Sequence, residues 1–157
     1  MLRLLATSLT TVLLLAGTLG CSKKDDPAPT TTVGTGSYKV SRDAIAGQTR
    51  GYLQLNVNGT KVDALGFTIS DTPTPQNNTR SLILYFEKPT GQPSTAYKLT
   101  GINYFPNNTN TLAMLDFTTA VATINETSTG VFSGTFSGTT ASGIVLSDGI
   151  FTDAHLQ

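Results

Sequence analysis

The sequence has no tryptophan, a single histidine (His155) and a single cysteine (Cys21) in 157 residues. One cysteine can form neither an internal disulfide framework nor the cysteine-rich ligand set of a structural zinc site. One histidine without a plausible nucleophile also gives no support to a Ser-His-Asp arrangement. These absences exclude the disulfide-stapled scaffolds and argue against the common hydrolytic triad.

Charged residues are scarce as well, at 13% of the chain, with ten basic and ten acidic side chains. Loss of residues 1–20 would remove Arg3 alone and leave nine basic against ten acidic residues, a net charge of −1. A nucleic-acid-binding domain carries a basic surface, so nucleic acid is not an expected partner. Thr, Gly, Ser and Asn are abundant instead, a mixture typical of strands joined by tight turns.

Residues 1–20 have the pattern of a secretory signal peptide. Residues 1–3 give a short positive start, and residues 4–19 form an apolar run interrupted only by small or hydroxyl residues. The run is short for a membrane span, and no stop-transfer pattern follows it. A buried core helix is the alternative, and the extreme N-terminal position argues against it.

Gly20-Cys21 resembles the end of the bacterial lipoprotein signal, in which a small residue precedes the lipid-accepting cysteine. Thr18 and Leu19 depart from the usual pattern of Leu and then a small residue. The resemblance implies a diacylglycerol thioether and an amide-linked chain such as palmitate on Cys21, enough for stable anchoring. Residues 22–26 resemble the lysine-and-acid export signals of surface-displayed gram-negative lipoproteins, with a plain soluble spacer as the alternative. The expected location is the outer membrane, with the cell surface favoured over a periplasm-facing position.

Residues 21–37 are expected to form the lipidated cysteine and a flexible tether. Pro27 and Pro29 stiffen its start, and Gly34 and Gly36 loosen its end. Such a tether would hold the following domain roughly 20 Å from the lipid head groups on average. The domain itself is expected over residues 38–157.

Residues 38–157 predict an all-β domain, because no stretch carries a helical period. Residues 52–57 alternate with Leu53, Leu55 and Val57 on one face, and Asn58-Gly59 then predicts a tight hairpin. A change of phase near Gly66 predicts a β-bulge. The apolar run 81–87 predicts a central strand, and residues 131–138 alternate Phe with Gly. We expect eight to ten antiparallel strands, arranged as a two-sheet β-sandwich rather than a closed barrel.

The domain also resembles a family of small lipoproteins of unknown function from the same surface-displaying bacteria. The motifs that carry the resemblance are Asn58-Gly59, Tyr97-Lys98-Leu99, Gly134-Thr135-Phe136 and Gly149-Ile150-Phe151. The resemblance covers about residues 38–157 and implies a β-sandwich. It implies no function.

Three kinds of catalytic or metal site are weighed and set aside. His155 and Asp153 share one face of the last predicted strand, with Asp148 nearby, but an exposed polar strand end explains them equally well. Calcium could use either of two Asn-rich loops, yet turn chemistry accounts for both. A glycosidase needs two opposed carboxylates, and nothing in the sequence pairs the scattered acids. The loop residues are Asp71, Asn77, Asn78, Asn107, Asn108 and Asn110, and the acids are Asp63, Glu87, Asp116 and Glu126. No cofactor and no enzymatic activity are expected.

Aromatic rings beside amide-rich loops indicate a surface that could stack on sugars. The candidate ligand-binding residues are Tyr104, Phe105, Asn107 and Asn108, with Tyr52 and Tyr85 as further aromatic candidates. Packing of these tyrosines in the core is the alternative. The sequence therefore predicts an anchored, non-catalytic module that binds a glycan or an envelope protein. A structural envelope component without a small ligand is the second hypothesis, and a hydrolase the third.

The anchor prediction is tested by Cys21→Ser in the full chain. Removal of the only thiol removes the only atom that can carry the thioether-linked lipid, so the variant should leave the membrane fraction for the soluble one. Fractionation with metabolic fatty-acid labelling measures this. A variant that stays membrane-bound as tightly as wild type would contradict lipid anchoring.

Overall fold

The computed structural model describes residues 33–73, 79–106 and 114–157. The expected signal peptide, Cys21 and the first part of the tether lie outside these residues. Asn77, Asn78, Asn107, Asn108 and Asn110 also lie outside them. Within the described residues, no helix is long and apolar enough to cross a membrane.

The described residues form nine strands and two short 3-10 helices. The strands are β1 (Gly34–Val40), β2 (Asp43–Gln54), β3 (Val62–Ser70), β4 (Ser81–Pro89), β5 (Lys98–Phe105), β6 (Leu115–Asp116), β7 (Thr119–Ser128), β8 (Val131–Thr139) and β9 (Val145–His155). The 3-10 helices are η1 (Val57–Gly59) and η2 (Ser94–Ala96). The all-β prediction is confirmed, and the strand count lies within the predicted range.

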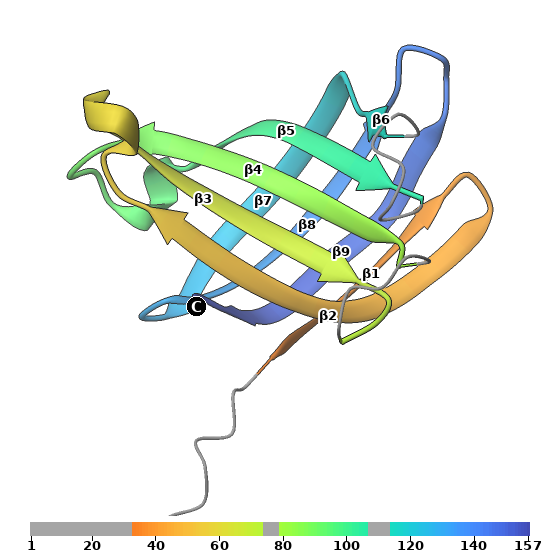
Figure 1. The fold of residues 1–157 in the computed structure, drawn as a ribbon, viewed down its shortest axis with the longest axis horizontal. Helices are drawn as coiled ribbons and strands as arrows, with labels where there is room; N and C mark the ends of the chain where they lie inside the picture. The colour runs from red at the N-terminus through yellow and green to blue at the C-terminus, as the bar shows by residue number, and fades with distance from the viewer. Residues whose placement is uncertain (1–32, 74–78, 107–113) are drawn as a thin grey trace, which may run out of the picture. The chain divides into compact units, whose positions relative to one another are not determined.

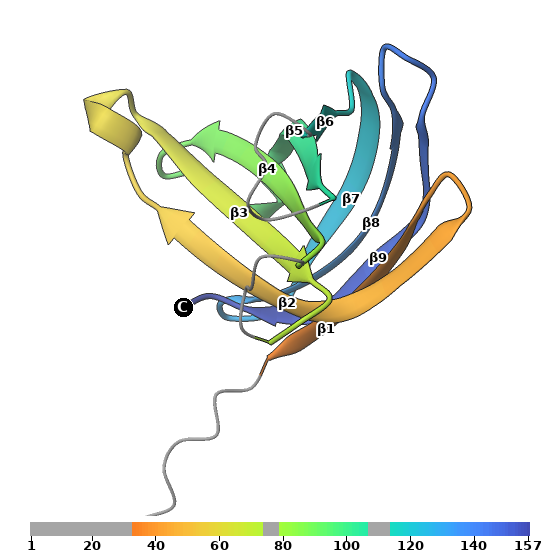
Figure 2. The same ribbon diagram turned by 45° about the vertical axis from the view of Figure 1, so that its right-hand side comes forward.

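All nine strands belong to one antiparallel sheet, in the order β6-β5-β4-β3-β2-β1-β9-β8-β7. The sheet curls into a half-barrel, with β2 to β5 on one wall and β7 to β9 on the other (Figures 1 and 2). Strand β1 pairs with β2 on one side and with β9 on the other, so it joins the two walls by hydrogen bonds. The two-sheet sandwich is therefore not confirmed.

The core fills the concave side of the sheet and is rich in aromatic rings. Phe67 of β3 stacks on Phe151 of β9 with 4.8 Å between ring centroids, and its ring also lies 5.6 Å from Phe132 and 6.0 Å from Phe86. These contacts join the two walls. The other buried apolar side chains are Tyr38, Val40, Ile45, Leu65, Ile69, Leu82, Leu84, Tyr97, Ile102, Tyr104, Phe117, Phe136, Leu146 and Ala154.

The first three strands differ from the prediction at the start of β1 and in the connection between β2 and β3. Strand β1 begins at Gly34 rather than at residue 38, so the last residues of the expected tether are part of the sheet. Strand β2 ends at Gln54, and Leu55 is 66% exposed. Asn58 and Gly59 do have positive φ, as the Asn-Gly pair predicts, but they lie in η1 within a longer connection. The predicted tight hairpin is therefore wrong, although its local conformational signal is right.

The predicted bulge at Gly66 is also wrong. Strand β3 pairs with both β2 and β4 without any shift of register. Asp63, Leu65 and Phe67 are buried on its inner side, while Ala64 is half-buried on the other. Gly66 faces outward, where a side chain from β2 covers it.

The glycines of β8 were expected to let a neighbouring sheet approach, but the group that approaches Gly134 belongs to an adjacent strand of the same sheet. Phe132 and Phe136 are buried, and a Cβ atom added at Gly134 would lie only 2.7 Å from the ring of Phe151. The glycine therefore leaves room on the inner face for a phenylalanine of the adjacent strand.

Gly47→Ala tests how closely the chain is packed at the edge of the first hairpin. A Cβ atom at Gly47 would overlap the backbone carbonyl of Ser70, which cannot swing away. We expect a loss of roughly 1–3 kcal/mol in the free energy of unfolding, measured by urea titration.

Gly101→Ala is the matched control in the same sheet. Its added Cβ would meet only the ring of Tyr85, at an ordinary 3.8 Å. Its free energy of unfolding should stay within about 0.5 kcal/mol of wild type. Equal losses in the two variants would contradict the packing explanation.

Candidate functional site

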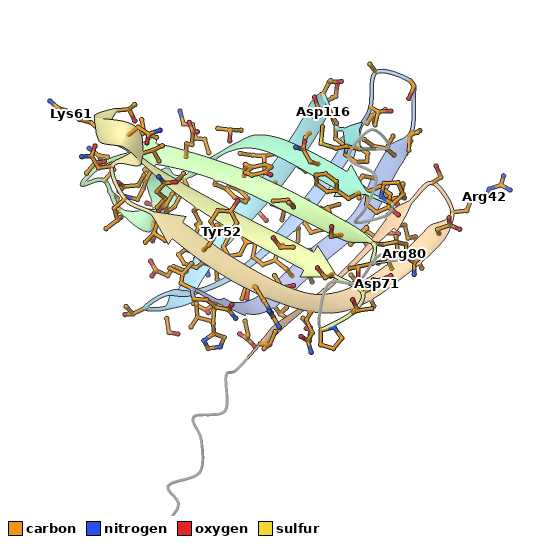
Figure 3. All side chains as sticks on the ribbon, viewed as in Figure 1. Arg42, Tyr52, Lys61, Asp71, Arg80 and Asp116 are labelled. Atoms are coloured by element: carbon orange, nitrogen blue, oxygen red, sulfur yellow. The ribbon has the colours of Figure 1, made fainter. Side chains whose placement is uncertain are left out.

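Two tyrosines and two glycines form a row across the convex, outer face of β2 to β5. Tyr52 pairs with Gly66, Gly66 with Tyr85, and Tyr85 with Gly101, so the four residues occupy one register position on four strands. Figure 3 shows Tyr52 over the middle of this wall. We call these four residues the tyrosine row.

The alternation of the strands places the tyrosines outside. Side chains two residues apart share a face of a strand, and Leu84 and Phe86 on either side of Tyr85 are buried in the core. Tyr85 must therefore point outward. Tyr52 must also point outward, because its cross-strand partner Gly66 lies between Leu65 and Phe67 of β3.

Each tyrosine ring lies over the glycine of the next strand. A Cβ atom at Gly66 would overlap the ring of Tyr52, and one at Gly101 would lie 3.8 Å from Cδ2 of Tyr85. Tyr52 nevertheless remains 41% exposed. Partial burial, with a smaller contribution from Tyr85, raises the pKa of the Tyr52 hydroxyl above its usual value. The ring of Tyr52 is thus held against the sheet with its hydroxyl in the neutral form.

Polar side chains flank the tyrosine row on both sides. The neighbouring row of outward-facing residues on one side contains Arg50, Thr68 and Asn103. The neighbouring row on the other side contains Gln54, Glu87 and Lys98. Two hollows adjoin the row, one of about 240 Å³ beside Tyr52 and one of about 370 Å³ beside Tyr85. The face therefore combines flat aromatic surface with groups that can donate and accept hydrogen bonds.

The four ligand-binding residues predicted from the sequence are not part of the tyrosine row. Tyr104 is only 6% exposed and packs edge-to-face on Tyr38, with 6.1 Å between ring centroids, so it is a core residue. Phe105 is half-buried at the end of β5. Asn107 and Asn108 lie outside the described residues. The structure instead brings together Tyr52 and Tyr85, which the sequence offers as secondary candidates.

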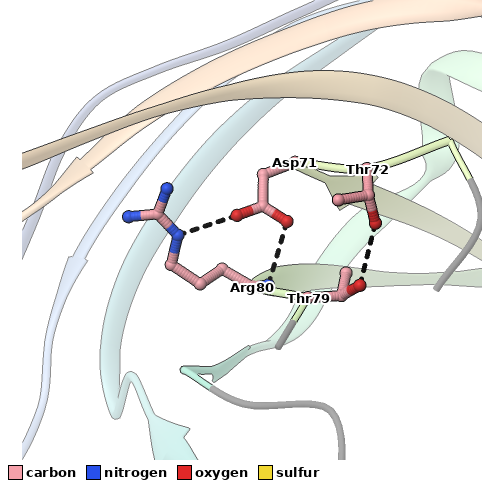
Figure 4. A network of polar contacts seen from close by, with 4 residues as sticks. All are labelled: Asp71, Thr72, Thr79 and Arg80. Atoms are coloured by element: carbon pink, nitrogen blue, oxygen red, sulfur yellow. Dashed lines mark hydrogen bonds and ion pairs between the residues drawn. The ribbon is translucent and has the colours of Figure 1, made fainter. Parts of the chain in front are cut away.

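Asp71, a possible calcium ligand, is already engaged by Arg80 (Figure 4). One carboxylate oxygen accepts the backbone N–H of Arg80 at 3.0 Å, and the other accepts its Nε–H at 2.8 Å. The hydroxyls of Thr72 and Thr79 lie 2.8 Å apart beside this pair. These contacts join the two ends of the β3–β4 connection, which explains Asp71 without a metal.

The other acid and histidine candidates do not converge. Asp148 pairs with Lys39 at 2.9 Å, and Asp153 is exposed with a φ of 50°. Among the described residues, no three His, Cys, Asp or Glu side chains group as a metal site would require. Glu126 accepts the backbone N–H of Gly130 at 2.9 Å, which lowers its pKa. These residues therefore make local contacts at turns and strand ends.

A buried ion pair joins the start of β3 to the end of β4. Asp63 accepts hydrogen bonds from Lys88 Nζ at 2.7 Å, from the Thr90 hydroxyl at 2.7 Å and from the Asn56 N–H at 2.9 Å. These bonds, led by the one from Lys88, lower the pKa of Asp63 to about 2. The ammonium of Lys88 also lies 5.2 Å above the ring of Tyr97. Asp63 therefore fastens the β2–β3 connection to the end of β4.

Comparison of the chain with protein families, with curated proteins and with solved structures finds no match.

Asp63→Asn tests the buried pair through pH. The pKa of Asp63 is about 2 in the folded protein, and that of an aspartate in an unfolded chain is about 3.9. The pair therefore contributes its full stability above about pH 4, and this contribution fades as the pH falls towards 2. The variant leaves Lys88 largely buried without its partner, so its urea midpoint should lie below wild type at pH 7.

The difference between the two midpoints should narrow from pH 4 to pH 2. Asp148→Asn is the control, because its exposed pair with Lys39 should contribute little at any pH. A midpoint difference that is independent of pH would contradict the assigned role of the Asp63 carboxylate.

Proposed function

We propose that this protein is a lipid-anchored, non-catalytic binding module of the outer membrane, and that its tyrosine row binds a glycan. The observation that carries the proposal is the pair of outward-facing tyrosines at one register position, with the ring of Tyr52 over Gly66 and one edge of the Tyr85 ring beside Gly101. The anchor is the lipid on Cys21 that the signal sequence predicts. The proposed location is the cell surface.

The chemistry of the face suits a sugar. One face of a pyranose ring carries several C–H bonds, which pack on the flat surface of an aromatic ring, while its hydroxyls seek hydrogen bonds at the edges. Tyr52 supplies exposed ring surface, and Arg50 and Thr68 lie one step along the same strands. Because the rings already rest on the sheet, little side-chain freedom is lost when a ligand binds.

An alternative explanation of the same rings is purely structural. Aromatic residues placed across from glycines stabilise strands by covering the exposed backbone. Under that explanation the face binds nothing, and the protein is a structural component of the envelope. Large apolar side chains exposed elsewhere favour an envelope contact, since Val121 on β7 is 67% exposed.

Alanine substitution of each tyrosine separates the two explanations. Once a glycan array has identified a ligand, Tyr52→Ala and Tyr85→Ala should each weaken its binding roughly two- to twelvefold, the equivalent of one aromatic contact. Tyr52→Phe should retain most of the affinity because it keeps the ring. Isothermal calorimetry measures the affinities, and thermal unfolding checks that each variant is folded.

Val121→Ala is the matched control, because it truncates an exposed apolar side chain on a strand remote from the tyrosine row in the sheet order. Its affinity should equal that of wild type. Loss of stability in Tyr52→Ala and Tyr85→Ala, together with unchanged glycan affinity, would support the structural explanation and reject the tyrosine row as the site.

A further inference from the structure

The two tyrosines are separated by one intervening strand. Tyr52 lies on β2 and Tyr85 on β4, with Gly66 of β3 between them at the same register position. Neighbouring strands are about 4.8 Å apart, so the two positions are about 10 Å apart across the sheet. Both side chains lean toward the following strand, Tyr52 over Gly66 and Tyr85 toward Gly101.

This spacing is too large for adjacent sugars of one chain to occupy both rings. In a β-1,4-linked chain each pyranose is turned over relative to its neighbour, so every second ring presents the same face in the same direction. The two-residue repeat of such an extended chain is close to the separation of the tyrosines. The first and third sugars would then stack on Tyr52 and Tyr85, and the middle sugar would lie between the two rings.

The polar flanks fit the edges of the same kind of chain. A ribbon whose hydroxyls are equatorial presents them along both edges, and polar residues lie on both sides of the tyrosine row. The charges on this face balance, because the register places Arg50 and Lys98 on it together with Glu87 and Asp116. An uncharged glycan is therefore favoured over an acidic one.

The curvature of the wall limits the length of the site. The tyrosine row runs across the strands on the convex side of a curled sheet, so the surface falls away at both ends (Figure 2). An extended, stiff chain can follow such a surface over only a few sugars. Contacts beyond the two rings are few.

We infer that the tyrosine row recognises an uncharged β-1,4-linked glycan through three consecutive sugars, with the first and third stacked on Tyr52 and Tyr85. This inference rests on the proposed glycan-binding function and specifies its ligand class. The middle sugar lies between the two rings, and its hydroxyls reach the polar side chains of the flanks.

The experiment is a calorimetric length series on the mature protein. The probes are β-1,4-linked glucose oligomers and β-1,4-linked N-acetylglucosamine oligomers of two to five residues, with α-1,4-linked glucose oligomers of equal length as the control. In at least one β-linked series, the association constant should rise roughly two- to twelvefold from the disaccharide to the trisaccharide, when the second ring is engaged. It should change little from three residues to five. The α-linked series should show no such step.

The variants test the two stacking positions separately. In Tyr85→Ala or Tyr52→Ala the step between disaccharide and trisaccharide should disappear, because only one ring remains. Val121→Ala should keep the step. Binding of β-linked oligomers without a step at three residues would overturn this inference and leave the proposed function standing. Binding of an unrelated glycan alone would also overturn this inference and leave the proposed function standing. Absence of binding to every glycan tested would overturn both.

Discussion

The fold depends on the stacking of Phe67 on Phe151 between the two walls of the half-barrel. The two rings come from β3 and β9, which are separated in the sheet by β2 and β1, and their centroids lie 4.8 Å apart. A single sheet can bring such distant strands together only by curling, and burial of the rings stabilises the curl. Glycines make the approach possible, since an added Cβ atom at Gly51 or Gly134 would crowd one of these rings.

The same pairing of aromatic and glycine residues recurs on the outer face, with a different consequence. Inside, Gly134 leaves room for the ring of Phe151, which is fully buried. Outside, Gly66 lets Tyr52 lie flat against the strand, yet the ring keeps a solvent-facing side. One sequence device therefore supplies both the packing of the core and an exposed aromatic surface. Which of the two results depends only on which side of the strand the pair occupies.

The sequence allowed the strand class to be predicted but not the site. Alternation and turn residues were sufficient for an all-β domain and for a strand over residues 81–87 with neighbours on both sides, although only its inner face is fully covered. To predict the face on which a tyrosine lies, the exact phase of its strand must be known. The side chains of Tyr85 and Tyr104 lie on opposite sides of the sheet. Leu53 and Leu55 pointed to a regular hairpin, whereas Asp63 bonds the backbone of Asn56 and shapes a longer connection. Asp63 is held in place by Lys88, which lies 25 residues further along the chain, and no local pattern indicates that partner.

Polar anchors at the strand ends give the outer face its rigidity. Asp63 with Lys88 holds the end of β4 to the β2–β3 connection, and Asp71 with Arg80 joins β3 to β4 at the other end. Strands β3 and β4, which carry Gly66 and Tyr85, are thus fixed at both ends as well as along their ladder. A surface fixed in this way loses little freedom when a ligand binds, so even two modest ring contacts can add to affinity instead of offsetting an ordering cost. The proposed binding face lies on strands and requires no moving loop, which suits the proposed tethered module.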